Sequence, residues 1–146
     1  MGYKTSTLIS PAQFDAIYKP SMLRVTEFLR SHGVDVICYY SSGNLIPLLP
    51  SLLDAGVNMT MPVECAAGMD ALDLRRRFGK DLLLMGNISR QAIMDGRAAI
   101  HEEVMNKVPR LMEEGGYIPA FDDAIMEDMR YEDVLYCAEL IKSIRI

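Results

Sequence analysis

The sequence predicts an α/β fold whose four short strands run parallel and are joined by helices. Apolar stretches suited to buried strands begin near residues 34, 58, 82 and 117, and helical patterns separate them. A connection that returns the chain parallel to the preceding strand needs a crossover helix, which is almost always right-handed. The choice therefore lies between an open doubly wound sheet and a barrel. No Gly-x-Gly-x-x-Gly follows any strand, which argues against dinucleotide binding.

Residues that typically begin and end helices mark the limits of the first helix, and an apolar run marks the strand that follows it. Ser10 caps the expected helix start, and Pro11 occupies the first turn, where its missing N–H has no partner to lose. The apolar stripe continues to Gly33, with a bend expected at Pro20. Residues 34–38 are nearly all apolar, which is typical of a strand covered on both faces.

The later elements continue the alternation of helix and strand. Strands are expected over residues 58–62, 82–85 and 117–120, and helices over residues 45–55, 71–78, 89–114 and 134–144. Asp70 is the expected cap of the helix at 71–78, and Gly79 its stop. The long helix is expected to break at Gly96 and to restart at Pro109.

Composition excludes several classes of protein. The 146 residues are 50% hydrophobic and 24% charged, which is enough for one globular domain with a core. The net charge is -5, and the single cationic run, Arg75 to Arg77, lies in a helical pattern, so no nucleic-acid partner is expected. No leader or apolar run of about 18 residues appears, so no membrane span is expected. Three scattered cysteines without Cys-x-x-Cys indicate neither a disulfide framework nor a zinc ribbon, and favour the cytoplasm.

Polar side chains stand where the predicted strands end. Because ligand sites of α/β proteins form at the carboxyl ends of parallel strands, we predict one pocket there. Its expected members are Tyr40, Ser42, Asn44, Glu64, Asp122 and Asp123. Glu64 or Asp123 would act as the acid or base, and the other four would hold substrate. Aromatic and acidic side chains together suit a cationic or neutral polar ligand.

The same residues also have purely structural interpretations. Glu64 is also interpretable as a carboxylate that accepts N–H bonds from the backbone of residues 66–69. Asp122 and Asp123 are equally compatible with an ordinary turn. Core packing is the expected role of Cys38, Cys137, Met59, Met61 and Met85.

Several motifs spread along the chain carry a family resemblance. They are Gly43-Asn44, Ala55-Gly56-Val57, Val63 to Asp70 (VECAAGMD), Phe78-Gly79-Lys80, Met85 to Ile88, Gly115 to Pro119 and Glu132 to Leu135. In these motifs the sequence resembles the carboxyl half of the uroporphyrinogen decarboxylase family, whose superfamily includes cobamide-dependent methyltransferases. Tyr3-Lys4 and Leu8 to Pro11 resemble the family's mid-barrel segment. The resemblance implies that residues 1–146 form a single domain, the carboxyl-terminal half of a (β/α)8 TIM-type barrel.

The methyltransferase branch implies a zinc site that this sequence does not retain. In that branch a His-x-Cys pair, a glutamate and a late cysteine bind zinc, which activates a thiol. The corresponding positions hold Tyr40 and Ser42, Glu64, and Asp123, so only the glutamate remains. A zinc site is therefore disfavoured, and no cofactor is expected in this chain. A hard-cation site made of Glu64, Asp122 and Asp123 stays chemically allowed.

The decarboxylase branch fits less well. That branch uses no metal, and arginines that come mostly from the amino half hold the carboxylates of the tetrapyrrole. Its late histidine falls on Asp123 and its mid-barrel serine on Lys4. These departures and an acidic rim, which repels a polyanion, count against porphyrin decarboxylation.

The resemblance also implies an incomplete barrel. Family members are about twice this length, as a full barrel requires. Four strands cannot close, so we expect a homo-oligomer or a complementary half-barrel chain as partner. The expected function is that of a protein most like the corrinoid-linked methyltransferase branch, inactive alone, with a corrinoid protein as a further partner. The alternatives are a decarboxylase or lyase fragment and a non-catalytic half-barrel scaffold or truncated gene product.

Overall fold

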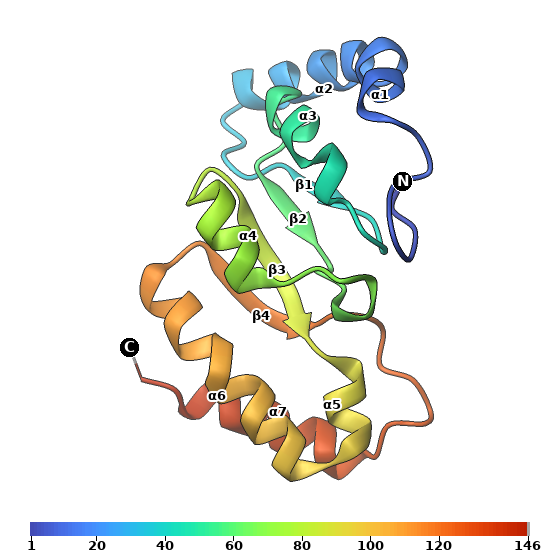
Figure 1. Cartoon of the computed structure of the whole chain (residues 1–146). Helices are drawn as coiled ribbons and strands as arrows, with labels where there is room; N and C mark the ends of the chain where they lie inside the picture. Colours follow the sequence, from blue (N-terminus) through green and yellow to red (C-terminus); the bar gives the residue numbers. More distant parts are fainter. Residues whose placement is uncertain (146) are drawn as a thin grey trace.

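The computed structural model describes residues 1–145 and contains a four-stranded parallel sheet with strand order β1-β2-β3-β4 (Figure 1). The strands are β1 (Cys38–Tyr40), β2 (Met59–Met61), β3 (Leu83–Ile88) and β4 (Tyr117–Phe121). Each strand pairs in parallel with the one before it in the sequence. The predicted α/β class and its four parallel strands are confirmed, and the arrangement is that of half a TIM barrel.

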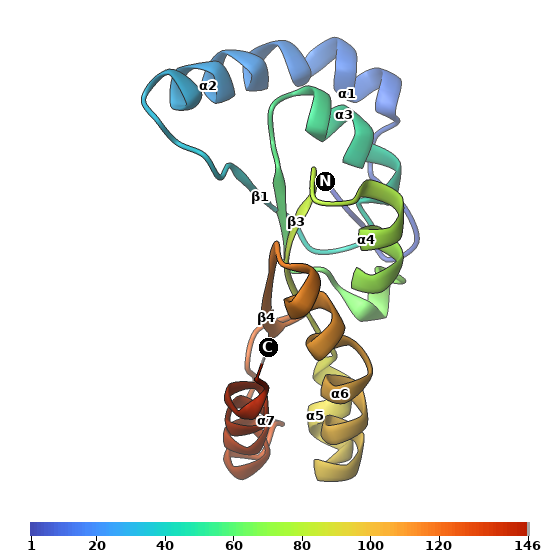
Figure 2. The ribbon, with the colours of Figure 1, turned by 90° about the vertical axis from the view of Figure 1, so that its left-hand side faces the viewer.

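Helices connect the strands, and α3, α4 and α6 lie on one side of the sheet (Figure 2). Their bounds are α1 (Pro11–Ile17), α2 (Lys19–Ser31), α3 (Leu49–Asp54), α4 (Ala71–Phe78), α5 (Arg90–Asp95), α6 (Arg97–Glu114) and α7 (Tyr131–Ser143). Short 3-10 turns, η1 (Ile46–Leu48) and η2 (Cys65–Ala67), follow β1 and β2. No helix within residues 1–145 is long and apolar enough to cross a membrane.

The predicted helix caps are confirmed. The Ser10 hydroxyl accepts the N–H of Gln13 at 3.2 Å, and the Gln13 side chain accepts the N–H of Ser10 at 3.0 Å, which is a complete capping box. Asp70 accepts the N–H of Asp73 at 2.7 Å at the start of α4, and Gly79 ends that helix with φ 58°. The bend expected at Pro20 is the break between α1 and α2 at Tyr18.

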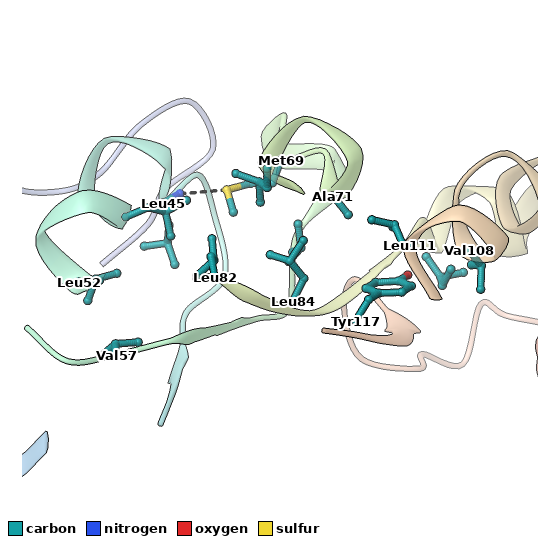
Figure 3. Close-up of a cluster of buried hydrophobic side chains, with 14 of the residues drawn as sticks. Leu45, Leu52, Val57, Met69, Ala71, Leu82, Leu84, Val108, Leu111 and Tyr117 are labelled. Atoms are coloured by element: carbon teal, nitrogen blue, oxygen red, sulfur yellow. Dashed lines mark hydrogen bonds between the residues drawn. The ribbon is translucent and has the colours of Figure 1, made fainter. Parts of the chain in front are cut away.

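The core fills the space between the sheet and these helices (Figure 3). Leu84 on β3 is fully buried, and the ring of Tyr117 on β4 lies beside Val108 and Leu111 of α6. The Tyr117 hydroxyl donates to the carbonyl of Gly86 at 2.8 Å, so its polar end is satisfied. Burying one such large apolar side chain contributes about 1.5–3 kcal/mol, and this layer therefore fixes the sheet beneath the helices.

The first strand differs from its prediction. It covers Cys38–Tyr40 instead of residues 34–38, because only these residues pair with Met59–Met61 of β2. Cys38 and Tyr40 are exposed, since α3, α4 and α6 all lie on the other side of the sheet (Figure 2). The predictions that this strand is covered on both faces and that Cys38 is a core residue are therefore wrong. Cys137 is fully buried, as predicted.

Two other boundaries also change. Strand β3 continues past Met85 to Ile88, because its last three residues pair with Pro119 to Phe121 of β4. Helix α6 runs without a restart through Pro109. The proline removes one backbone donor, so the helix lacks the hydrogen bond to the carbonyl of Met105, four positions earlier on a face where this residue is 42% exposed.

Candidate functional site

A pocket of about 580 Å³ opens at the carboxyl ends of β2, β3 and β4. Its lining comes from three loops: Glu64, Cys65 and Ala66 after β2, Ser89, Arg90, Gln91 and Met94 after β3, and Asp122 and Asp123 after β4. The volume falls within the range of small-molecule sites. Of the six residues that the sequence places in one pocket, the structure brings Glu64, Asp122 and Asp123 together here.

Glu64 is half-buried, and one of its two carboxylate oxygens is fixed. The N–H of Gly43 donates to Oε2 at 2.6 Å, so the loop after β1 orients the side chain. Within residues 1–145 no donor lies within hydrogen-bonding distance of Oε1, and no cation lies within ion-pair distance of the carboxylate. Its structural anchor is therefore Gly43, not the backbone of residues 66–69. One oxygen remains available to a ligand.

Asp122 ties the three loops together. Its side chain is nearly fully buried, at 3% exposure, and both oxygens accept backbone N–H groups. Oδ2 accepts from Cys65 at 2.9 Å and Oδ1 from Arg90 at 2.8 Å, while its own N–H donates to the carbonyl of Ile88 at 2.9 Å. A buried carboxylate needs such partners. Asp122 is therefore saturated and holds the pocket's walls in place.

Arg90 is the cation of the pocket, and acidic neighbours already engage it. Its guanidinium lies 2.9 Å from Asp128 and 3.6 Å from Asp123. Asp123 is exposed and also accepts the N–H of Ala124 at 2.8 Å. The single positive charge of Arg90 is shared by Asp123 and Asp128, and neither Glu64 nor Asp122 has a cation within ion-pair distance in residues 1–145. The pocket is thus negative overall.

Behind the pocket, Asn87 forms a buried hub at the end of β3. It is the one non-glycine residue with positive φ within residues 1–145, at 63°, and it is fully buried. Its amide nitrogen donates to the carbonyls of Val63 and Met69 at 2.9 and 2.8 Å, and its side-chain oxygen accepts the N–H of Ala71 at 3.0 Å. Asparagine suits this position because its amide both donates and accepts. The hub links the loop after β2 to the start of α4.

Lys107 of α6 completes this hub. Its ammonium donates to the carbonyl and the side-chain oxygen of Asn87, at 2.8 and 3.2 Å, and to Glu103 at 2.7 Å. Glu103 in turn accepts the N–H of Ser89 at 2.7 Å. The charged pair is mostly buried, so its many hydrogen bonds are what make burial tolerable. All of these bonds hold the loop after β3 in position.

Cys65 is a protonated thiol at neutral pH. Burial raises its pKa from 9.0 to about 12, against the lowering effect of Lys107, and the carboxylates of Asp122 and Glu103 raise it further. The sulfur lies 3.2 Å from the amide nitrogen of Asn87 and 3.9 Å from the ammonium of Lys107. A thiolate nucleophile requires the opposite shift. Cys65 therefore contributes packing and hydrogen bonding to the pocket wall.

The other three predicted site residues lie beside this pocket instead of lining it. Tyr40 is 67% exposed and Ser42 is exposed. The side chain of Asn44 donates to the carbonyl of Ala67 at 3.0 Å and accepts the N–H of Ile46 at 3.0 Å. Its amide thus joins the loop after β1 to the loop after β2. Within residues 1–145 no three His, Cys, Asp or Glu side chains are grouped as a metal ion would require.

Sequence reasoning missed Arg90, Glu103 and Lys107. Glu103 and Lys107 are four residues apart on α6, and that spacing predicts an ion pair on a helix, but it does not predict burial. Arg90 follows Ser89 at the expected start of a helix, where nothing in the local sequence links it to Asp128. The packing of α6 against the sheet places Glu103 and Lys107 behind the pocket, and the loop after β4 brings Asp123 and Asp128 to Arg90 of α5.

Comparison with known families agrees with this architecture. The family model described as uroporphyrinogen decarboxylase (URO-D) matches residues 4–144. No curated protein matches the chain.

Proposed function

Because this chain belongs to the uroporphyrinogen decarboxylase family, we propose that it supplies the carboxyl half of a barrel active site in which Glu64 acts as the acid or base. The chain alone is inactive, since the loops of four further strands would complete the rim. The ligand is a neutral or cationic polar molecule. The corrinoid-linked methyltransferase branch is the one that this proposal adopts, because Glu64 stands at the position of that branch's glutamate.

The geometry of Glu64 is the observation that carries this proposal. Its Oε2 is held by the N–H of Gly43 at 2.6 Å, and no donor within residues 1–145 reaches Oε1 at the pocket wall. An acid or base must be oriented and also keep an atom for the substrate. Asp122 fails the second condition because backbone N–H groups occupy both of its oxygens. Asp123 is engaged by Arg90 and Ala124.

Charge supports a cationic or neutral ligand. Glu64 and Asp122 have no cation within ion-pair distance in residues 1–145, whereas Arg90 is already paired with two aspartates. A polycarboxylate entering this pocket would meet net negative charge without a free arginine. The alternative of porphyrin-type decarboxylation therefore has the weaker support.

The proposed chemistry includes no step through zinc. Tyr40, Ser42 and Asp123 stand where the methyltransferase ligands would be, and a phenol and a hydroxyl are poor substitutes for imidazole and thiolate. Cys65, the one thiol in the pocket, keeps its proton because burial raises its pKa to about 12. A corrinoid protein as methyl donor stays part of the proposal. It would act as a separate chain at the completed rim.

A non-catalytic half-barrel is the second candidate function, and a specific observation favours it. The amide of Asn44 and both oxygens of Asp122 are committed to backbone groups, so several polar residues of the rim hold loops together. In that case Glu64 would likewise serve only to anchor Gly43. Ligand binding that depends on Glu64 separates the two candidates.

The test measures binding of a small organic cation to the isolated chain. Titration with tetramethylammonium chloride, followed by the backbone N–H signals of Gly43 and Cys65, reports directly on the pocket. We expect saturable shifts with tetramethylammonium and none with acetate. Glu64→Gln keeps an acceptor for Gly43 but removes the charge, so we expect affinity to fall about tenfold or more, equivalent to about 1.4 kcal/mol, with an unchanged melting temperature.

Asp123→Asn is the matched control, because the Asp123 carboxylate is already engaged by Arg90 and by the N–H of Ala124. It should leave tetramethylammonium affinity nearly unchanged. If Asp123→Asn lost tetramethylammonium binding and Glu64→Gln kept it, Asp123 and not Glu64 would be the carboxylate that binds the ligand. Equal binding of tetramethylammonium to the wild-type chain and to Glu64→Gln would contradict the proposal and favour the non-catalytic half-barrel.

A further inference from the structure

One face of the sheet is apolar and only partly covered. Thr60, Leu84 and Tyr117 form one row of paired residues that is buried beneath the helices. Side chains alternate along a strand, so the residues that follow them point to the opposite face. There Tyr40 pairs with Met61, and Met85 with Ile118. We call these four residues the open-face row.

The open-face row is most exposed at its two ends, on the edge strands β1 and β4. Tyr40 is 67% exposed and Ile118 is 50% exposed, while Met61 and Met85 are half-buried. Both faces of a parallel sheet are normally covered. Figure 2 shows α3, α4 and α6 on the other side of the strands. This face therefore needs an apolar cover that residues 1–145 of one chain do not supply.

Both edges of the sheet carry free backbone groups. On β4, Gly116 and Asp122 bond to β3, so by alternation Tyr117, Pro119 and Phe121 direct their backbone groups away from the sheet. On β1, Ile37 and Ser41 bond to β2, so Cys38 and Tyr40 face outward in the same way. Pro119 lacks an N–H, but its carbonyl and the groups of its neighbours remain. Each edge can therefore accept a parallel strand.

The chain exposes somewhat more surface than a compact monomer of its mass. Such a monomer of 16.4 kDa exposes about 7,500 Å² by the usual scaling with mass, whereas this chain exposes 8133 Å². The difference is in the direction expected of a sheet with one face left open.

We propose that two copies of this chain close an eight-stranded parallel barrel, with β1 of one copy beside β4 of the other at both junctions. A two-fold axis parallel to the strands places the β1 edge of each copy against the β4 edge of the other. It also keeps all eight strands parallel. Eight strands give an interior just wide enough to be filled by side chains, and the two open-face rows supply large apolar ones. Each copy also brings its rim loops beside the pocket of the other.

The assembly concerns the sheet and its edges, so it is independent of the chemistry of Glu64. Glu64→Gln should leave the assembly unchanged even where it abolishes ligand binding. Conversely, a monomer that binds tetramethylammonium through Glu64 would overturn the dimer and leave the proposed function intact. The two proposals can therefore fail separately.

The test is the mass of the purified chain at micromolar concentration, measured by light scattering and sedimentation equilibrium. We expect about 33 kDa, twice 16.4 kDa. Ile118→Glu places a charge in the closed interior and should raise the dissociation constant about a hundredfold or more. Met105→Glu is the matched control, because Met105 is 42% exposed on α6, on the helix-covered side of the sheet, and should leave the dimer unchanged.

Further variants keep the test decisive. Tyr40→Glu changes a side chain that is 67% exposed in the single chain, so it separates loss of assembly from loss of folding if Ile118→Glu unfolds. A short bismaleimide should join Cys38 to an introduced Ile118→Cys between copies, and fail with Met105→Cys. A mass of 16.4 kDa, or a dimer that survives both Ile118→Glu and Tyr40→Glu, would overturn the proposal. So would a heterologous partner protein that is needed to cover the face.

Discussion

Replacement of Asp122 by alanine should destabilise the chain strongly, although its neighbour Asp123 tolerates the same change. Asp122 is 3% exposed and accepts the N–H groups of Cys65 and Arg90 at 2.9 and 2.8 Å. Hydrogen bonds to a charged group contribute about 1.5–3 kcal/mol each. Water from the adjacent pocket would partly replace the lost acceptor, because Cys65 and Arg90 are only half-buried. We therefore expect a loss of about 2–4 kcal/mol in the free energy of unfolding.

Urea denaturation followed by far-UV circular dichroism measures this difference. For a chain of this length the expected loss corresponds to a fall of about 5–15 °C in melting temperature. Hydrogen exchange adds a site-specific readout, since the amide protons of Cys65 and Arg90 should exchange faster in Asp122→Ala. Asp123→Ala is the control, because Asp123 is exposed and bonds only locally and to Arg90. Equal midpoints for the two variants would refute the role assigned to Asp122.

Two further predictions concern Cys65 in the pocket wall and the buried guanidinium of Arg75. Because burial raises the pKa of Cys65 from 9.0 to about 12, its alkylation by iodoacetamide at pH 8 should be about a thousandfold slower in the folded chain than in urea. The folded state keeps the thiol proton of Cys65 that the unfolded state loses, so this contribution to the free energy of unfolding is present below pH 9 and disappears as the pH rises toward 12. If the free energy of unfolding of Cys65→Ser fell with pH as steeply as that of the wild-type chain, this prediction would be contradicted. Arg75 is 7% exposed and donates to the carbonyls of Gly79, Gly115 and Gly116. Arg75→Met should therefore lower the free energy of unfolding by about 2–4 kcal/mol. An unchanged urea midpoint would show that these hydrogen bonds do not stabilise the fold.

Local signals in the sequence were sufficient for elements whose causes are local. The cap at Ser10, the cap at Asp70 and the stop at Gly79 each depend on residues within one helical turn, and the structure has all three. Helices between the apolar stretches predicted crossover connections, and these predicted four parallel strands. Strand limits were less predictable, because β1 begins at Cys38, where β2 offers a partner, and not where the apolar run begins.

For the candidate site too, the sequence predicted some features and only the structure revealed others. The sequence placed Glu64, Asp122 and Asp123 at strand ends, and parallel strands bring such ends to one rim. Which of the three is free for a ligand depended on contacts between distant segments. Asp122 is saturated by N–H groups 57 and 32 residues away, and Glu64 is held by one that is 21 residues away.

The sequence by itself therefore determined the family, the order of helices and strands, and the end of the sheet at which polar groups collect. Those features follow from side-chain periodicity and from capping over a few residues. Tertiary structure alone decided that Lys107 and Glu103 lie behind the pocket, that Arg90 pairs with Asp123 and Asp128, and that the open-face row lacks a cover within residues 1–145. The physical reason is that hydrogen bonding, burial and charge pairing depend on distances in space between segments that are far apart in the sequence.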